Sequence, residues 1–312
     1  MARNSKHITN LFKKLSVNNV DLSGKVALII GGNEGIGLFT AINLAKMNCK
    51  VIIASRNSEK SKSAVEKIKQ ESNNSNVDYE LVDLLDFSNI SKFTKLISEK
   101  LASLDYLILN SGATFYEFEK SKDGIEKTIQ LNHLGHLLLT MNLLPIVKKA
   151  EKAKIIFVSS ASHLDTKLEL PQDLSPTADT FAGYLLYCKS KLMNVMTAKE
   201  LSKRLASDNI TVASLHPGFV ATDVIVTNLP KNTWQGTLIW AASRTLHYLL
   251  GRTPDQGSLT TVYTIIDENI KPGAYYDSCE LSEHNPQVDD DEICKQLFDE
   301  SLKIIGFNGD SE

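Results

Sequence analysis

Short hydrophobic runs rich in β-branched residues recur along the chain and alternate with longer amphipathic segments. Runs of this kind are typical of parallel strands that are buried on both faces of a sheet. The segments between them, such as 58–70 and 89–101, repeat apolar residues with a period near 3.6 and indicate helices. The predicted strands are VALII at 26–30, VIIAS at 51–55, YELV at 79–82, YLILN at 106–110, IIFVS at 155–159 and ITVASL at 210–215.

The alternation of strand and helix predicts an α/β fold of the Rossmann type, a doubly wound parallel sheet joined by right-handed crossovers. No repeat or low-complexity linker divides the chain, so we expect a single domain over residues 22–284 that includes any substrate pocket. Residues 285–312 should form a C-terminal helical appendage, and residues 1–21 an N-terminal basic amphipathic extension.

The N-terminal extension places Ile8, Leu11, Phe12 and Leu15 on one face of a predicted helix with basic residues between them. The simpler interpretation is packing against the edge of the domain; the alternative is attachment to a membrane surface or targeting to an organelle. No secretory signal is expected, because no hydrophobic segment follows the basic residues. The longest apolar stretches also fall short of the ~20 residues that span a bilayer.

Composition excludes several classes of function. The 312 residues are 42% hydrophobic and carry a net charge of −3, which is ordinary for a globular protein and does not favour nucleic acid as a partner. The four cysteines are widely spaced and no histidines cluster at ligand spacing, so we expect neither a metal site nor a disulfide framework. These features favour a cytoplasmic protein, free or peripheral to an intracellular membrane, and not a secreted one.

A glycine-rich turn, GGNEGIG, follows the first predicted strand and leads into a helical pattern. Glycines at 31, 35 and 37 would let the backbone turn tightly and approach a pyrophosphate, which would sit at the helix N-terminus beside Ile36. A merely tight strand-to-helix turn is the alternative. The context of strand before and helix after favours a dinucleotide site over Gly31, Gly35, Ile36 and Gly37.

The end of the second predicted strand bears on the choice of dinucleotide. An NAD site usually has an acidic residue there to bind the ribose 2′-hydroxyl, but this chain has Ser55 followed by Arg56. The Arg56 guanidinium would suit a 2′-phosphate, whereas Glu34 in the glycine turn argues mildly the other way. We therefore favour NADP(H) over NAD.

A tyrosine followed four residues later by a lysine occurs twice in the chain. On one face of a helix the ammonium could stabilise a tyrosinate and lower the pKa of the tyrosine. Tyr116 and Lys120 lie in a polar segment, whereas Tyr187 and Lys191 lie in a long helical pattern after the fifth strand. The second pair is therefore predicted to be catalytic.

Two further polar residues stand near the same predicted sheet edge. Ser160 follows the fifth strand at the carboxyl edge, where open α/β sheets bind ligands. Asn132 lies among leucines, where a buried amide needs hydrogen-bond partners. It is either a functional residue or a satisfied core amide.

The order of these motifs along the chain resembles that of the short-chain dehydrogenase/reductase family. The likeness is greatest to the retinol dehydrogenase-like and WW-domain oxidoreductase-like branch of that family. Ile30 departs from the threonine usual before the first glycine, and Ser111 replaces the alanine of the family's NAG motif, so that Ser111 could offset the lost hydroxyl. The motifs that carry the resemblance are VIIASRN, Asn110–Ser111–Gly112, NHLGHLLLT with Asn132, VSSASH with Ser160, YCKSKL, LHPGFVATD with Pro217 and Gly218, and GAYYDSCELSEHNPQ.

The resemblance implies an NADP-dependent oxidoreductase that transfers a hydride between NADP(H) and the carbonyl or alcohol carbon of a small lipophilic substrate, such as a retinoid, steroid or aldehyde. Ser160 would bond the substrate oxygen, Tyr187 would supply the proton, Lys191 would lower its pKa and bond the ribose, and Asn132 would hold a relay water. The resemblance also implies cofactor contacts by Asp83 and Asn110 on the adenine side, by Gly112 and Pro217, and by Val220 and Thr222 at the carboxamide. Asp83 and Thr222 could instead be helix caps.

Other interpretations remain open at the level of sequence. An NADP(H)-binding sensor or scaffold without significant turnover is the main alternative; a methyltransferase would not need Tyr187 and Lys191. The substrate pocket should involve residues 161–186 and 224–250, where Trp234, Ile239, Trp240 and Tyr248 either line the pocket, pack in the core or face a membrane. The sequence leaves open whether the chain forms a homo-oligomer.

Overall fold

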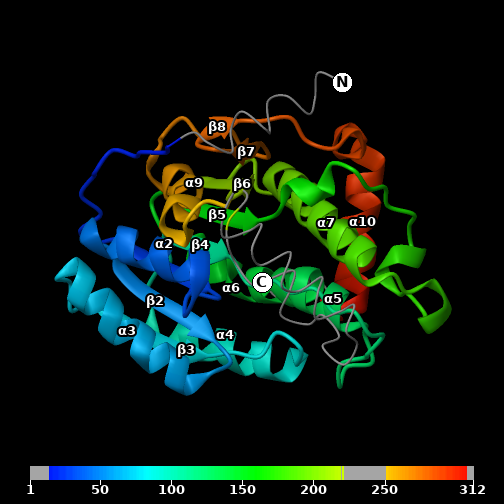
Figure 1. Ribbon diagram of the computed structural model, residues 1–312, viewed down its shortest axis with the longest axis horizontal. Helices are drawn as coiled ribbons and strands as arrows, with labels where there is room; N and C mark the ends of the chain where they lie inside the picture. Colours follow the sequence, from blue (N-terminus) through cyan, green and yellow to red (C-terminus); the bar gives the residue numbers. More distant parts are fainter. Residues whose placement is uncertain (1–13, 219, 221–250, 308–312) are drawn as a thin grey trace.

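The computed structural model describes residues 14–218, 220 and 251–307, and within them a mostly parallel eight-stranded sheet forms the centre of the molecule (Figure 1). The strand order is β3-β2-β1-β4-β5-β6-β7-β8, and only the β7–β8 pair is antiparallel. Each predicted run forms a strand, which confirms the doubly wound fold. The strands are β1 (Val26–Ile30), β2 (Lys50–Ser55), β3 (Val77–Leu81), β4 (Tyr106–Leu109), β5 (Ala153–Val158), β6 (Ile210–His216), β7 (Tyr275–Asp277) and β8 (Glu280–Leu281).

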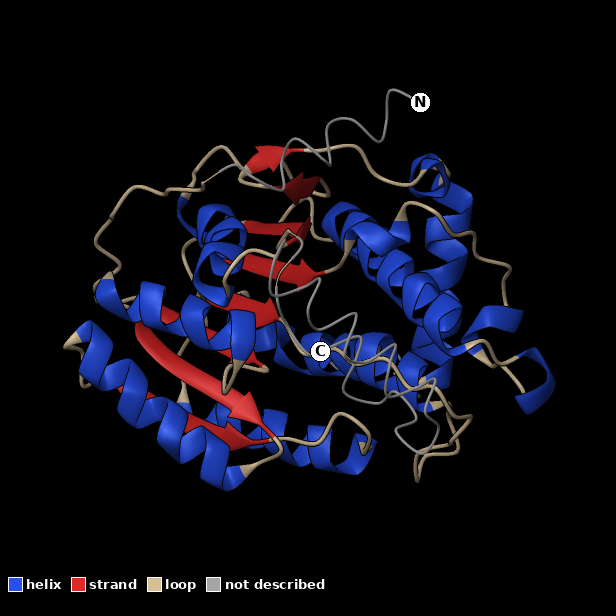
Figure 2. Cartoon of the chain, viewed as in Figure 1, coloured by secondary structure: helices blue, strands red, loops and turns tan. Residues whose placement is uncertain are grey.

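Helices cover both faces of the sheet (Figure 2). On one face α2 packs between α3 and α9, and on the other α4, α6 and α7 follow one another across the strands. Both faces of β1 and β4 are therefore buried, which explains their uninterrupted apolar sequences. The α-helices are α2 (Gly35–Lys46), α3 (Ser58–Ser72), α4 (Phe87–Lys100), α5 (Lys127–Ile129), α6 (Gly135–Val147), α7 (Gly183–Arg204), α9 (Pro254–Ile266) and α10 (Asp291–Ile304).

The C-terminal helix α10 lies outside α7 and α6 and packs mainly against α7. Its residues Cys294, Leu297 and Phe298 are fully buried and belong to the same hydrophobic cluster as the interior of α6 and α7. At the other end of the chain, the backbone N–H of Leu15 donates to Gln256 of α9 at 2.8 Å. Both terminal segments are thus joined to the central domain by specific contacts.

The chain reverses direction across the sheet between β1 and β4. From β1 the order runs outward through β2 and β3, and from β4 it runs the other way through β5 and β6. Such a switch point opens a crevice at the carboxyl ends of the strands, where α/β proteins bind ligands. The glycine turn after β1 and Asn110 after β4 both lie there.

One segment departs from the regular helix expected around Asn132. Residues Gln130–Leu134 form a π-helical turn between α5 and α6. The side chain of Asn132 bonds the backbone of Ala113 on a neighbouring loop, and a Cβ on Gly135 would lie only 2.9 Å from the carbonyl oxygen of Leu84. The widened turn is thus bonded to the neighbouring loop and lies close to Leu84, and π-helical turns are frequent at functional sites.

Several predictions fall outside the described residues. They concern Ile8, Leu11 and Phe12 of the N-terminal helix, Thr222, and the stretch 224–250 with Trp234, Ile239, Trp240 and Tyr248. Among the helices that the structure describes, none combines the length and the apolar character needed to cross a bilayer.

Candidate active site

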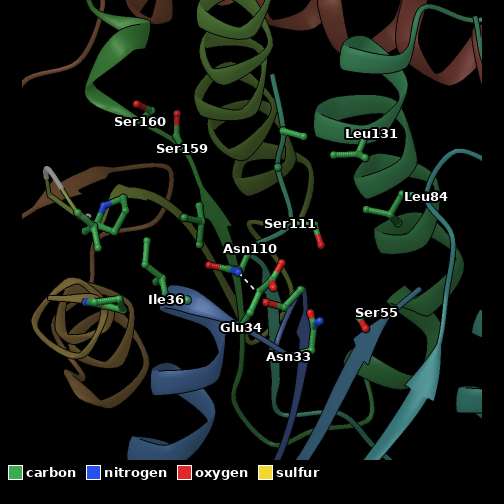
Figure 3. A pocket seen from close by; sticks show the side chains of 18 of the residues that line it. Asn33, Glu34, Ile36, Ser55, Leu84, Asn110, Ser111, Leu131, Ser159 and Ser160 are labelled. Atoms are coloured by element: carbon green, nitrogen blue, oxygen red, sulfur yellow. Dashed lines mark hydrogen bonds between the residues drawn. The ribbon is translucent and has the colours of Figure 1, made fainter. Parts of the chain in front are cut away.

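A cavity of about 700 Å³ opens at the carboxyl edge of the sheet. Its wall includes the loops that follow β1, β2, β3, β4, β5 and β6, and the first half of α7 (Figure 3). Gly37 and Asn132 do not line the cavity but support its wall from behind. The predicted site residues that do line it are Gly31, Gly35, Ile36, Arg56, Asp83, Asn110, Gly112, Ser160, Tyr187, Lys191, Pro217 and Val220.

The glycine turn is a close-packed cradle. Gly31 has φ +83°, and a Cβ there would lie 2.5 Å from the hydroxyl oxygen of Ser111. A Cβ on Gly37 would lie 2.0 Å from the carbonyl oxygen of Gly31, so only glycine lets α2 approach the turn. The amide of Asn110 donates to the same carbonyl oxygen at 2.9 Å and ties β4 to the turn (Figure 3).

The N-terminus of α2 faces the cavity without a side-chain cap. Glu34 is the N-cap residue, but its carboxylate makes no hydrogen bond to the first turn of the helix. By contrast, α3 is capped by Asn57 and α4 by Asp86. The first N–H groups of α2 are therefore available to an anion in the cavity.

Replacing Gly37 by alanine should destabilise the fold by about 3 kcal/mol or more, because the new Cβ would overlap a backbone oxygen that cannot move independently. Gly24→Ala is a control for backbone strain alone: Gly24 has φ +80°, unlike Gly37 in α2, but a Cβ there meets no atom within 4 Å. Its cost should be about 1 kcal/mol of backbone strain. Denaturant unfolding of both variants measures the difference, and equal costs would refute the close-approach argument.

One end of the cavity carries positive charge. Arg56 is exposed on the wall after β2, and Lys60 lies beside it in the first turn of α3. The Lys60 ammonium contacts the Glu34 carboxylate at 2.7 Å, so the acid that argued against NADP is neutralised by a neighbour. The sequence patterns did not single out Lys60, although its position four residues after Arg56 in the first turn of a helix was a usable signal.

At the other end of the cavity α7 presents Tyr187 and Lys191, both buried. The hydroxyl of Tyr187 is hydrogen-bonded to Ser160. The Lys191 ammonium donates to the carbonyl oxygen of Val158 at 3.0 Å and lies 5.7 Å from the centre of the Tyr187 ring. Three predicted residues, one from the loop after β5 and two from α7, therefore lie together at this end of the cavity.

The expected lowering of the Tyr187 pKa is wrong for this arrangement. Burial raises the pKa of Tyr187 above its ordinary value, and the hydrogen bond with Ser160 offsets only part of that rise. Burial also lowers the pKa of Lys191 to about 8. Desolvation opposes charge on either side chain, and it outweighs the attraction that helical spacing alone suggested.

The polar atoms of the Asn132 side chain are hydrogen-bonded to other groups of the protein. Its Oδ1 accepts from the N–H of Ala113 at 2.9 Å, and its Nδ2 donates to the carbonyl oxygen of Ala113 and to the hydroxyl of Ser190, each at 2.9 Å. It thus joins the π-helical turn, the loop after β4 and α7. That loop includes Gly112, where a Cβ would lie 2.9 Å from the Lys191 ammonium nitrogen.

The positions of Asp83 and of the Tyr116–Lys120 pair in the structure bear on two alternatives that the sequence left open. Asp83 lines the cavity and accepts from the N–H of Leu85, while the N-cap of α4 is Asp86. The other tyrosine–lysine pair lies outside any helix, and Lys120 forms an isolated bridge with Glu126.

A doubly wound sheet with a glycine turn at its switch point and a tyrosine–lysine pair on a cavity-lining helix defines a dinucleotide-binding oxidoreductase. The family model for short chain dehydrogenases matches residues 25–171. Retinol dehydrogenase 11 of Mus musculus is 33% identical over 292 residues, which cover 93% of this chain and 89% of the relative. The chain therefore belongs to the short-chain dehydrogenase/reductase family, in its retinol dehydrogenase-like branch.

Other similar proteins agree with this assignment. The human WW domain-containing oxidoreductase is 30% identical over 294 residues, which cover 91% of this chain and 69% of that protein. Among solved structures, an uncharacterized protein from Mycobacterium paratuberculosis has a TM-score of 0.74 at 23% identity, covering 93% and 96% of the two chains. A short chain dehydrogenase from Escherichia coli complexed with NADPH has a TM-score of 0.64 at 20% identity, covering 84% and 99%.

Proposed function

We propose that this oxidoreductase transfers a hydride between NADP(H) and the carbonyl or alcohol carbon of a small lipophilic substrate. The observation that carries the proposal is the convergence of Ser160, Tyr187 and Lys191 at one end of a cavity whose other end is the glycine cradle. The cavity thus has an anion-binding end at the glycine cradle and a proton-transfer end at Ser160, Tyr187 and Lys191. An extended dinucleotide needs both.

The residues present suit NADP(H). The uncapped N-terminus of α2 can bind a pyrophosphate, and the cradle leaves no room for a Cβ at Gly31 or Gly37. At the ribose end Arg56 and Lys60 supply two cations against the single carboxylate of Glu34. An excess of positive charge favours a 2′-phosphate, and the NADPH complex of the Escherichia coli dehydrogenase supports the same choice.

When bound, the cofactor supplies or accepts the hydride. In the reducing direction the Ser160 hydroxyl bonds the substrate oxygen and Tyr187 donates its proton to that oxygen. A raised pKa suits Tyr187 to the role of proton donor, and the nearby Lys191 ammonium stabilises the tyrosinate that remains. Asn132 contributes by holding the loop at Gly112 against Lys191.

The substrate is proposed to be apolar, as the names of the retinol dehydrogenase relatives suggest for those proteins. Phe115 and Leu131 line the cavity, and Tyr184 stacks on Tyr187 at the catalytic end, with 6.2 Å between ring centres. Turnover of NADPH with a panel of retinoids, steroids and aliphatic aldehydes tests this. NADPH binding without turnover of any of them would support the sensor alternative.

Replacing Arg56 by aspartate should weaken NADPH binding at least about tenfold more than NADH binding, because the variant opposes a 2′-phosphate with a carboxylate. Titration calorimetry with both nucleotides measures the ratio. Lys92→Asp, an identical charge change on the exposed face of α4, controls for the overall charge of the protein. If Arg56→Asp lost affinity for NADPH and NADH equally, the 2′-phosphate assignment would be refuted.

A further inference from the structure

The segment before α10 binds the segment that follows Ser160. Asn285 is buried, and its amide nitrogen lies 2.9 Å from the carbonyl oxygen of His163, 3.2 Å from that of Leu164 and 2.7 Å from that of Thr166. Its Oδ1 accepts from the N–H of Gln287 at 2.9 Å. The single side chain of Asn285 thus lies within hydrogen-bond distance of three carbonyl groups in residues 163–166.

Gln287 extends this attachment. Its Oε1 accepts from the N–H of Leu168 at 2.7 Å, and its Nε2 donates to the carbonyl oxygen of Leu168 at 3.1 Å. Asn285 and Gln287 together therefore fix residues 163–168, which lead from the end of β5 towards α7. Neither residue lines the cavity.

His163 connects the attachment to the catalytic end. The ring is fully buried and lies against Tyr275, with 4.6 Å between ring centres. Its Nδ1 is 2.6 Å from the carbonyl oxygen of Ser160, and its Nε2 is 3.4 Å from the backbone nitrogen of Asn285. Since a carbonyl oxygen only accepts, Nδ1 must carry the proton and Nε2 must accept from the Asn285 N–H.

We propose that His163 and Asn285 are positioning residues for Ser160. The backbone of Ser160 is held by His163, His163 is held by Asn285, and the Ser160 hydroxyl accepts from the N–H of Ser162 within the same fixed turn. The hydroxyl thereby keeps its direction towards Tyr187. The inference rests on the proposed function, because the Ser160 hydroxyl matters only if it bonds a substrate oxygen.

Asn285→Asp separates positioning from folding. Aspartate keeps the oxygen that accepts from Gln287, but it places a carboxylate against three carbonyl groups and removes the donor. We expect kcat to fall about 10- to 100-fold while the dissociation constant for NADPH changes less than about twofold, because a displaced catalytic group loses rate and the cofactor cradle is untouched. Steady-state kinetics and nucleotide titration provide the split.

Asn74→Asp is a closely matched control. The Asn74 amide donates to the carbonyl oxygens of Ala45 and Cys49, each at 3.0 Å, and its Oδ1 accepts from the N–H of Asn76 at 2.8 Å. Asn74 lies before β3, at the sheet edge opposite the cavity. Both variants should lower Tm, but only Asn285→Asp should lower kcat. Equal kcat values for the two variants, measured below both melting temperatures, would overturn the proposal.

A second measurement needs neither turnover nor a variant. Nitrogen-15 NMR of the histidine side chains should show His163 as the Nδ1–H tautomer, and finding the Nε2–H tautomer would refute the connection to Ser160.

If Asn285→Asp does not fold, His163→Phe keeps a ring against Tyr275, removes the donor to Ser160 and carries the same kinetic prediction. Absence of turnover in the unaltered protein would refute the proposed function alone, since the tautomer would still be measured.

Discussion

Tyr187→Phe should reduce carbonyl turnover by about 10²–10⁴-fold, the usual contribution of a general acid–base group. The substitution removes one hydroxyl at nearly constant volume from a buried position on α7, so the fold and NADPH binding should persist. Its hydrogen bond with Ser160 is lost, but Ser160 remains fixed through its own backbone. Single-turnover reduction with bound NADPH measures the chemical step directly.

Tyr116→Phe is the matched control for that experiment. Tyr116 belongs to the second tyrosine–lysine pair, which lies after β4 outside any helix and does not line the cavity. The turnover of the Tyr116→Phe variant should stay close to that of the unaltered protein. Near-normal reduction by Tyr187→Phe with NADPH still bound would contradict the mechanism and favour a sensor.

Lys191→Met should also abolish most turnover, yet it should stabilise the cofactor-free protein. Burial lowers the pKa of Lys191 to about 8, so the charged form costs folding free energy of order 1–3 kcal/mol. The hydrogen bond to Val158, which methionine cannot make, returns part of that cost. A residue that opposes stability while serving chemistry is expected at an active site.

The stability difference should depend on pH. Between pH about 8 and the higher pKa of the unfolded chain, the unfolded state binds more protons at this position, so the stability of the unaltered protein rises with pH relative to Lys191→Met. Below pH about 8 the full penalty is present. Lys154, whose pKa burial also lowers to about 8, is common to both proteins and cancels in the comparison. Parallel curves of Tm against pH would contradict the prediction.

Local periodicity was sufficient to predict β1 to β6, because parallel strands buried on both faces have continuous apolar sequences. The short strands β7 and β8 were not predicted from the sequence. The motifs singled out many of the residues that line the cavity, but not Lys60, and they also included Gly37 and Asn132, which do not line it. Contacts between distant residues could not be predicted in this way. The pairing of Glu34 with Lys60 and the attachment of Asn285 to His163 depend on how helices and loops meet in space, and neither leaves a periodic pattern.

The direction of the pKa shift of Tyr187 could not be predicted from the sequence either. Spacing along α7 predicts how near a lysine lies, but not how much water surrounds either side chain. Both groups are almost fully buried, so solvent exclusion decides the direction of each shift. The widened turn at Asn132 is likewise bonded to Ala113 and Ser190, which come from other parts of the chain and leave no pattern near Asn132 in the sequence.

Asn285 follows α7 in the sequence, so the residues that hold Ser160 in place are synthesised after the residues that they support. The glycine turn, Arg56 and Tyr187 all leave the ribosome before Asn285 and Gln287, and nascent domains begin to fold from the N-terminal side. Residues 163–168 therefore have no attachment to Asn285 and Gln287 until those two residues have been synthesised. Under the proposal above, the backbone of Ser160 gains its support from His163 and Asn285 later in the order of synthesis than the glycine turn and α7 are made.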